Sequence, residues 1–241
     1  AGLQPTDVDA LLLSTVSHFH QTPALAPQLA DKLGMVDAAA YDISAACAGF
    51  CYGLAQAEAL VRAGSARYVL VIGAETLSQM TDIHDRGTAF IFADGAGAVV
   101  IGPADEPEIG PTVWGSDGDQ WDVIAQRESW TELRAGLASG DRSSPAWPNI
   151  GMAGQTVFRW AVWSMAKVAQ QALDAAGITV DELDVFLPHQ ANLRIIDAMA
   201  KQLKLPEHVV IATDIIDSGN TSAASSPLAG ERLIREGKAK S

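Results

Sequence analysis

The alternation of apolar and polar positions along the chain predicts strands and helices that follow one another in turn. Short runs rich in Val, Ile and Leu are typical of buried strands, and the segments between them carry apolar residues at helical spacing. The expected strands cover residues 10–16, 39–45, 67–75 and 95–102, and the expected helices cover 23–34 and 47 to about 63. This succession predicts an α/β fold in which helices cover a sheet.

A different pattern occupies residues 103–155, where Pro, Gly, Asp and Ser cluster around scattered tryptophans. These residue types favour turns and loops over regular elements. We therefore expect a long excursion that runs over the surface or covers a cleft.

The second half of the chain repeats the plan of the first. VDALLLS (8–14) is followed by a helical segment and then by YDISAACAGF (41–50). In the same way, LDVFLPH (183–189) is followed by a helical segment and then by TDIIDSGNTSAAS (213–225). The alternative to a duplication is coincidence, because many α/β chains yield such echoes.

If the repeat is real, the chain consists of two similar halves. We place them at residues 1–103 and 104–241. Cys47 and Asn220 then lie at matching strand-to-helix turns.

Composition and charge exclude several classes of function. The 241 residues are 48% apolar and 19% charged, as in a globular protein, and no apolar stretch approaches the ~20 residues of a membrane helix. The formal net charge of −13 argues against nucleic-acid binding as a main function. The two cysteines, Cys47 and Cys51, are too few and too close for a disulfide framework or a zinc site, which is typical of the reducing cytosol.

Cys47 starts the helix that follows the run YDISAA. A thiol at a helix N-terminus experiences the positive end of the helix dipole, which favours the thiolate and lowers the pKa. The alternative is that Cys47 is a small buried apolar residue. Cys51, one turn further along, is expected to pack into the core.

His189 and Asn220 complete a candidate catalytic set. His189 lies where a strand exits, a place at which α/β sheets present functional groups. Asn220 is likewise expected at a strand-to-helix turn, although its alternative role is to cap the next helix. Together with Cys47 they would supply a nucleophile and two donors to an oxyanion. A structural role is expected for the other histidines, His18, His20, His84 and His208.

Five segments along the chain resemble the motifs of β-ketoacyl-acyl carrier protein synthase III, in order and in spacing. They are SAACAGFCYGL (44–54), DRGTAFIFADGAGAVV (85–100), MAGQTVFRWA (152–161), PHQANLRI (188–195) and GNTSAASSPLA (219–229). The resemblance implies a thiolase-like fold of two similar halves, with layered α/β/α/β/α sheets, in a cytoplasmic homodimer. It also implies that family segments before Ala1 and after Ser241 are absent from this sequence.

The resemblance implies a decarboxylative condensation that starts type II fatty-acid synthesis. An acyl group passes from coenzyme A to Cys47, and malonyl-acyl carrier protein then loses CO2 and attacks the thioester, with His189 and Asn220 as donors. The partners implied are acyl-CoA and malonyl-acyl carrier protein, and the reaction requires no metal and no redox cofactor.

The resemblance implies contact with acyl-CoA at Asn192, Gly154 and Phe158, and it places Thr22 in the acyl pocket of a partner subunit. Family members restricted to acetyl primers tend to carry a bulky aromatic residue at the position of Thr22, so longer or branched primers are expected here.

Because carrier proteins are acidic, docking should depend on a local basic patch. Arg194 and Lys201 are seven residues apart on one expected helix and share a face, with Lys204 nearby, and Arg159 is added by the resemblance. The alternative is that these are ordinary solvated charges.

Three other functions remain open at this point. A starter-unit or chain-transfer enzyme of polyketide assembly would use the same three residues. A non-catalytic dimerisation scaffold would keep the fold, although the retained Cys47 argues against it. A cysteine hydrolase would pair Cys47 with His18 or His20.

Overall fold

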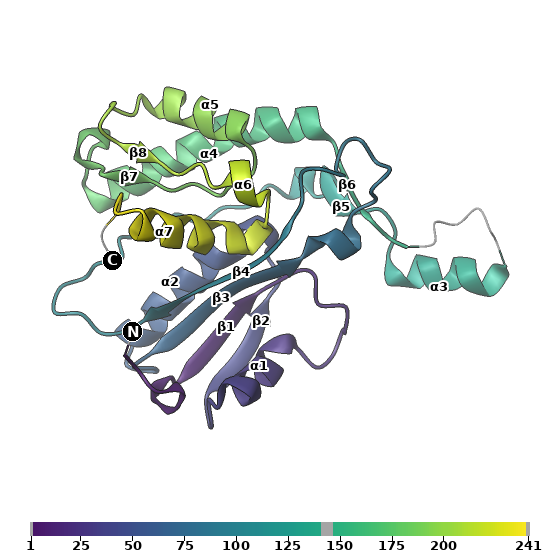
Figure 1. Cartoon of the computed structure of the whole chain (residues 1–241), viewed down its shortest axis with the longest axis horizontal. Helices are drawn as coiled ribbons and strands as arrows, with labels where there is room; N and C mark the ends of the chain where they lie inside the picture. The colour runs from purple at the N-terminus through teal and green to yellow at the C-terminus, as the bar shows by residue number, and fades with distance from the viewer. Residues whose placement is uncertain (1, 141–146, 240–241) are drawn as a thin grey trace.

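The computed structural model describes residues 2–140 and 147–239, and it contains eight strands and seven α-helices within those ranges (Figure 1). The strands are β1 (Ala10–Ser14), β2 (Ala39–Ile43), β3 (Val69–Thr76), β4 (Asp94–Ile101), β5 (Ile124–Gln126), β6 (Ile150–Met152), β7 (Val185–Phe186) and β8 (Val210–Ile211). The α-helices are α1 (Leu25–Leu33), α2 (Gly49–Arg62), α3 (Trp130–Ser139), α4 (Gly154–Ala176), α5 (Leu193–Leu203), α6 (Ile215–Ser218) and α7 (Ser225–Arg235). All the strands and helices expected between residues 10 and 102 are present, with ends within a few residues of the expected ones.

The main sheet has the strand order β2-β1-β3-β4. Strand β1 is parallel to β2 and to β3, whereas β4 is antiparallel to β3. All five residues of β1 are buried, which explains why its sequence is a continuous apolar run and does not alternate.

Helices cover both faces of this sheet. Leu11 and Leu13 of β1 pack with α1, whereas Leu12 points the other way and packs with Phe50 and Ala57 of α2. Successive side chains of a strand point to opposite faces, so one apolar run supports two layers of helix.

A second sheet and further helices complete five layers. Helix α7 lies beside α2 against the main sheet, and its Ala229 and Leu233 pack on the other side against Val185 and Leu187 near β7 (Figure 1). Phe186 of β7 points away from α7 and packs between α4 and α5. The order is thus helix, sheet, helices, sheet, helices, and the expected layered α/β/α/β/α arrangement is confirmed.

The described parts of the segment 103–155 are not wholly irregular. They include the antiparallel pair β5 and β6 and, between these strands in sequence, the helix α3, which projects to one side of the molecule (Figure 1). Within the part of the chain that the structure describes, no helix combines the length and apolarity that a membrane span requires.

The prediction that Cys51 packs into the core is wrong, because its side chain is exposed. The buried face of α2 carries Phe50, Gly53 and Ala57, and Cys51 lies off that face. Helical periodicity predicted that one face of α2 is buried, but it did not determine whether Cys51 lies on that face.

Candidate functional site

Cys47 lies in a short 3-10 turn, η2 (Ala46–Ala48), directly before α2. Ala46 adopts φ 44°, a left-handed conformation that residues with a Cβ rarely take and that recurs at functional sites. Gly49 packs so closely on β1 that an added Cβ would collide with Ser14 Oγ. The turn that presents the thiol is therefore held by one strained residue and by one glycine that has no tolerated substitute in this packing.

An equivalent turn precedes α7. It is the 3-10 turn η6 (Ser222–Ala224), whose first residue Ser222 has φ 49°, and it packs against η2. The duplication seen in the sequence thus extends to the strained residue that opens each turn.

The register predicted for the two turns needs correction. Ala46 matches Ser222, so the counterpart of Cys47 is Ala223, and Asn220 lies two residues before η6. Cys47 of the first half and Asn220 of the second half therefore hold different positions relative to the equivalent turns η2 and η6.

His189 follows β7 and is oriented by Ser225, the first residue of α7. The distance from His189 Nδ1 to Ser225 Oγ is 2.6 Å, and the Gln190 amide donates to the same oxygen at 3.3 Å. When Ser225 Oγ donates its proton to Nδ1, the imidazole carries its own proton on Nε2. Gln190 is fully buried, and its side-chain amide donates to the Pro188 and Ala212 carbonyls.

Asn220 is fixed by its backbone and by its side-chain oxygen. A β-bridge joins it to Phe92: the Asn220 amide donates to Ile91 O and the Ala93 amide donates to Asn220 O, both at 2.9 Å. Asn220 Oδ1 accepts from the Ser222 amide at 2.9 Å. The side-chain NH2 group is therefore left as the donor that the site can use.

Cys47 is half-buried, and its electrostatics are set by these neighbours. Burial opposes the charged form, but the attraction and hydrogen bonding of His189 and the nearby Ser222 hydroxyl outweigh it and hold the pKa of the Cys47 thiol below its usual value. The histidine that acts on Cys47 is His189. His18 and His20 stack on each other with ring centroids 5.4 Å apart, so the pairing expected for a cysteine hydrolase is not formed.

Four polar residues around the site escaped the reading of the sequence: Ser225, Gln190, Ser222 and Glu75. Ser225 and Ser222 lie in the same segment as Asn220, and Gln190 follows His189 directly. In the sequence, Glu75 is an acidic residue at the end of an expected strand. In the structure it shares the buried face of β3 with Val71 and Gly73, and its exposed fraction is only 4%.

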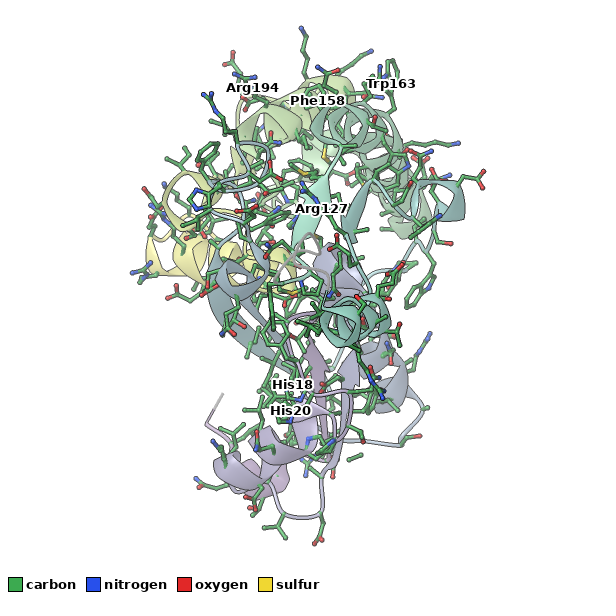
Figure 2. The ribbon with its side chains drawn as sticks, turned by 90° about the vertical axis from the view of Figure 1, so that its right-hand side faces the viewer. His18, His20, Arg127, Phe158, Trp163 and Arg194 are labelled. Atoms are coloured by element: carbon green, nitrogen blue, oxygen red, sulfur yellow. The ribbon has the colours of Figure 1, made fainter. Side chains whose placement is uncertain are left out.

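A pocket of about 770 Å³ opens between α4 and α5 and collects most of the remaining predicted residues. Gly154, Phe158 and Asn192 line it, and so do Arg159 and Arg194. Phe158 and Arg194 lie near each other at one end of the molecule, while His18 and His20 lie toward the other (Figure 2). Asn192 also caps α5, since its Oδ1 accepts from the Ile195 amide at 2.9 Å.

Two predicted residues lie outside this pocket. Lys201 is exposed two turns further along α5, and Thr22 is exposed in the loop before α1. Among the residues that the structure describes, no group of three or more His, Cys, Asp or Glu side chains could hold a metal ion.

The five layers, with a cysteine at one of two equivalent turns and a histidine acting on it, define a thiolase-like acyltransferase. Family models agree: 3-oxoacyl-[acyl-carrier-protein] synthase III matches residues 41–118, and its C-terminal domain matches residues 173–241. The chain is 60% identical to β-ketoacyl-[acyl-carrier-protein] synthase III 1 of Streptomyces coelicolor, over 100% of this chain and 71% of that protein. It is 50% identical to the mycobacterial synthase III of Mycobacterium avium, over 100% of this chain and 70% of that protein.

Solved structures place the chain in the same group. The priming β-ketosynthase of the R1128 polyketide pathway has a TM-score of 0.93 and 44% identity, over 98% of this chain and 69% of that one. The synthase III of Pseudomonas aeruginosa has a TM-score of 0.86 and 41% identity, over 97% of this chain and 70% of that one. The chain belongs to the β-ketoacyl-acyl carrier protein synthase III family, and it is a condensing acyltransferase.

Proposed function

We propose that Cys47, His189 and Asn220 carry out the condensation in two half-reactions. The Cys47 thiolate attacks the carbonyl carbon of an acyl-CoA, a new C–S bond forms, the C–S bond to coenzyme A breaks, and coenzyme A leaves as a thiolate that takes a proton from water. The C–CO2 bond of malonyl-acyl carrier protein then breaks, and its α-carbon attacks the acyl-Cys47 carbonyl. Cys47 leaves as the thiolate, and the products are CO2 and β-ketoacyl-acyl carrier protein.

The observation that carries this proposal is that the two donors are held in place by other bonds. Ser225 occupies Nδ1 of His189, which leaves Nε2 free, and Ser222 N–H occupies Oδ1 of Asn220, which leaves the NH2 group free. Two fixed donors suit the enolate oxygen that forms when malonyl decarboxylates, because they need no reorganisation as the charge develops.

The pocket between α4 and α5 suits the pantetheine-bearing substrates. Gly154 lines it beside Met152, and Phe158 and Asn192 offer an apolar face and an amide. We place acyl-CoA here, together with the arm of malonyl-acyl carrier protein, whose acidic body would contact Arg159, Arg194 and Lys201. This proposal includes no metal and no redox cofactor, and it takes the protein as a cytoplasmic homodimer like the family it resembles.

A second candidate is the priming step of polyketide assembly. It is favoured by the 44% identity to the R1128 priming β-ketosynthase. The two candidates share the chemistry and differ in the carrier protein. Rates with a fatty-acid carrier protein and with a polyketide carrier protein, measured side by side, would separate them.

The first test is to trap the acyl-enzyme. The purified protein is incubated with isobutyryl-CoA or acetyl-CoA, and the adduct is located by peptide mass. We expect it on Cys47 in the wild type and in Cys51→Ser, which serves as the matched thiol control. An acyl group on Cys51, or no adduct, would contradict the assignment.

The donors are tested by separating the half-reactions. Since one oxyanion donor is worth roughly 3 kcal/mol, His189→Ala and Asn220→Ala should each slow malonyl decarboxylation by about 100-fold or more. Acylation of Cys47 should be less affected. Equal losses in both half-reactions would show that these residues do not divide the work in this way.

A further inference from the structure

The mechanism above leaves one buried acid without a task. Glu75 ends β3, and its Oε2 accepts three hydrogen bonds from the turn after β1: from Ser17 Oγ at 2.7 Å, from the Val16 amide at 3.1 Å and from Thr15 Oγ1 at 3.2 Å. Ser17 Oγ also accepts from the Thr76 amide at 2.8 Å. Glu75 thus ties the end of β1 to the end of β3, beneath the turns that form the site.

No cation balances this carboxyl group. None of the ion pairs within residues 2–140 and 147–239 includes Glu75. A buried carboxylate is costly without a charged partner, and apolar side chains often replace such groups without loss of stability. Stability alone therefore does not explain an acid at this position.

Glu75 shares a face of β3 with Gly73, whose added Cβ would meet Ala223 of η6, so the Glu75 side chain lies on the side of that turn. Glu75 Oε1 and Ser222 Oγ are both buried, and neither has a hydrogen bond of full geometry among the described residues. Ser222 is 3% exposed and is the strained residue that opens η6. Its hydroxyl lies close enough to favour the charged forms of both Glu75 and Cys47.

Glu75 and Ser222 act on Cys47 with opposite sign. Burial raises the pKa of Glu75, and the hydrogen bonds from Ser17 and Val16, together with the nearby Ser222 hydroxyl, only partly offset it. The titratable groups that act on Cys47 are His189, which favours the thiolate, and Glu75, whose negative charge disfavours it. Ser222 adds a neutral hydroxyl on the favourable side.

We propose that Glu75 and Ser222 are positioning residues that set the charge and orientation of Cys47, with Ser222 linking the buried carboxyl to the thiol. The proposal rests on Cys47 being the acyl acceptor. Its advantage is chemical: a thiolate that is stabilised too strongly becomes a weaker nucleophile, so a nearby negative charge keeps Cys47 reactive toward a thioester.

The test is the pH profile of Cys47 alkylation by iodoacetamide, in a Cys51→Ser background. Glu75→Gln removes the negative charge and keeps an acceptor for the three donors. The pKa of Cys47 should fall, and a shift of one unit raises the thiolate fraction below that pKa by about tenfold. After the loss of intrinsic nucleophilicity, alkylation at low pH should accelerate by about threefold. The plateau rate at high pH should fall by about threefold, because nucleophilicity decreases with basicity.

Ser222→Ala should do the opposite. It removes the hydroxyl that favours the thiolate, so alkylation at the same low pH should slow by several-fold. Glu58→Gln is the matched control, since it removes one carboxylate from α2 that is paired with Arg62 at 3.1 Å, and it should leave the profile unchanged.

Opposite shifts in the two variants support the proposal. Shifts of the same sign, or two unchanged profiles, overturn it. If Glu75→Gln fails to fold, Ser222→Ala decides alone, and an unchanged profile overturns the proposal. A wild type that forms no acyl-Cys47 would instead refute the function on which the proposal rests.

Discussion

The single residue that most directly controls the chemistry of His189 is Ser225. It contacts Nδ1 at 2.6 Å and is itself held by the Gln190 amide. A histidine with a free Nδ1 could carry its proton on either nitrogen, and only the Nε2 tautomer donates to an oxyanion while Nδ1 accepts. The orientation of the His189 ring is thus set by a serine outside the three residues to which we assign the chemistry.

We therefore expect Ser225→Ala to slow malonyl decarboxylation by about tenfold, which corresponds to roughly 1.4 kcal/mol and is typical of one hydrogen bond to a charged or developing charged group. Ser225→Thr keeps the hydroxyl and should restore most of the rate. Steady-state decarboxylation and thermal unfolding should be measured for both variants. Equal losses in the two variants would indicate a packing role and not a role in proton placement.

At the scale of elements, the two catalytic turns depend on close approaches to the main sheet. Gly73 of β3 lies directly under Ala223 of η6, where an added Cβ would collide with the backbone carbonyl. Gly49 of α2 lies as closely on Ser14 of β1. Glycine at these positions lets the turns sit on the sheet and bring Cys47 and Asn220 together.

Gly73→Ala should therefore destabilise the protein by about 1–3 kcal/mol, as overpacking does, and should also reduce condensation. Gly118 has a clear space around it, so Gly118→Ala is the control and should change stability by less than about 0.5 kcal/mol. Urea unfolding provides both values. A Gly73→Ala protein with wild-type stability would show that η6 can move away from β3 without cost.

The helices α4 and α5 determine where the charges around the pocket lie. Arg159 and Arg194 line the pocket, whereas Lys201 is exposed on α5 outside it. The positions predicted for acyl-CoA and two of the positions predicted for the carrier protein thus line one pocket. Lys201 is the predicted docking residue that can be changed without altering that pocket.

Lys201→Glu should raise the KM for malonyl-acyl carrier protein several-fold and leave the KM for acyl-CoA nearly unchanged, because the carrier protein is acidic. Arg194→Glu should raise both values. Lys167→Glu, an exposed charge on α4, is the control, and high salt should reduce the differences. An unaltered KM for the carrier protein in the Lys201→Glu enzyme would show that Lys201 is not part of the docking surface.

At the scale of the whole molecule, the loop before α1 carries Thr22, which is expected to enter the acyl pocket of a partner subunit. Thr22 is exposed at the tip of this loop. Phe19, which could have filled the space left by a small residue at position 22, is already packed on Trp130 and Trp147 with ring centroids 6.1 and 5.5 Å away. Leu25 is likewise engaged in the core beneath α1.

The wild type should therefore prefer isobutyryl-CoA or longer primers over acetyl-CoA, since each buried CH2 is worth about 0.8 kcal/mol, close to fourfold in affinity. Thr22→Phe should shift the preference toward acetyl-CoA, and Gln21→Phe, at an exposed neighbour, should not. The values of kcat/KM across a primer series decide the question. A wild type selective for acetyl-CoA would contradict the role assigned to Thr22.

The pattern of the chain alone predicted much of the fold. Strands β1 to β4 and helices α1 and α2 were expected close to where they lie, because burial imposes a period on each element that its own residues display. The pattern also placed Cys47 and His189 shortly after strands, as they are in the structure, whereas Asn220 follows the short helix α6.

Contacts between distant segments were decided only in three dimensions. The match of Ala46 with Ser222, the bond from His189 to Ser225, the exposure of Cys51 and the proximity of Glu75 to Cys47 all depend on how β3, α2 and α7 pack together. Local periodicity reports which face of an element is buried but not what lies against it. Residues 36 positions apart, as His189 and Ser225 are, meet only when the layers close around a common core.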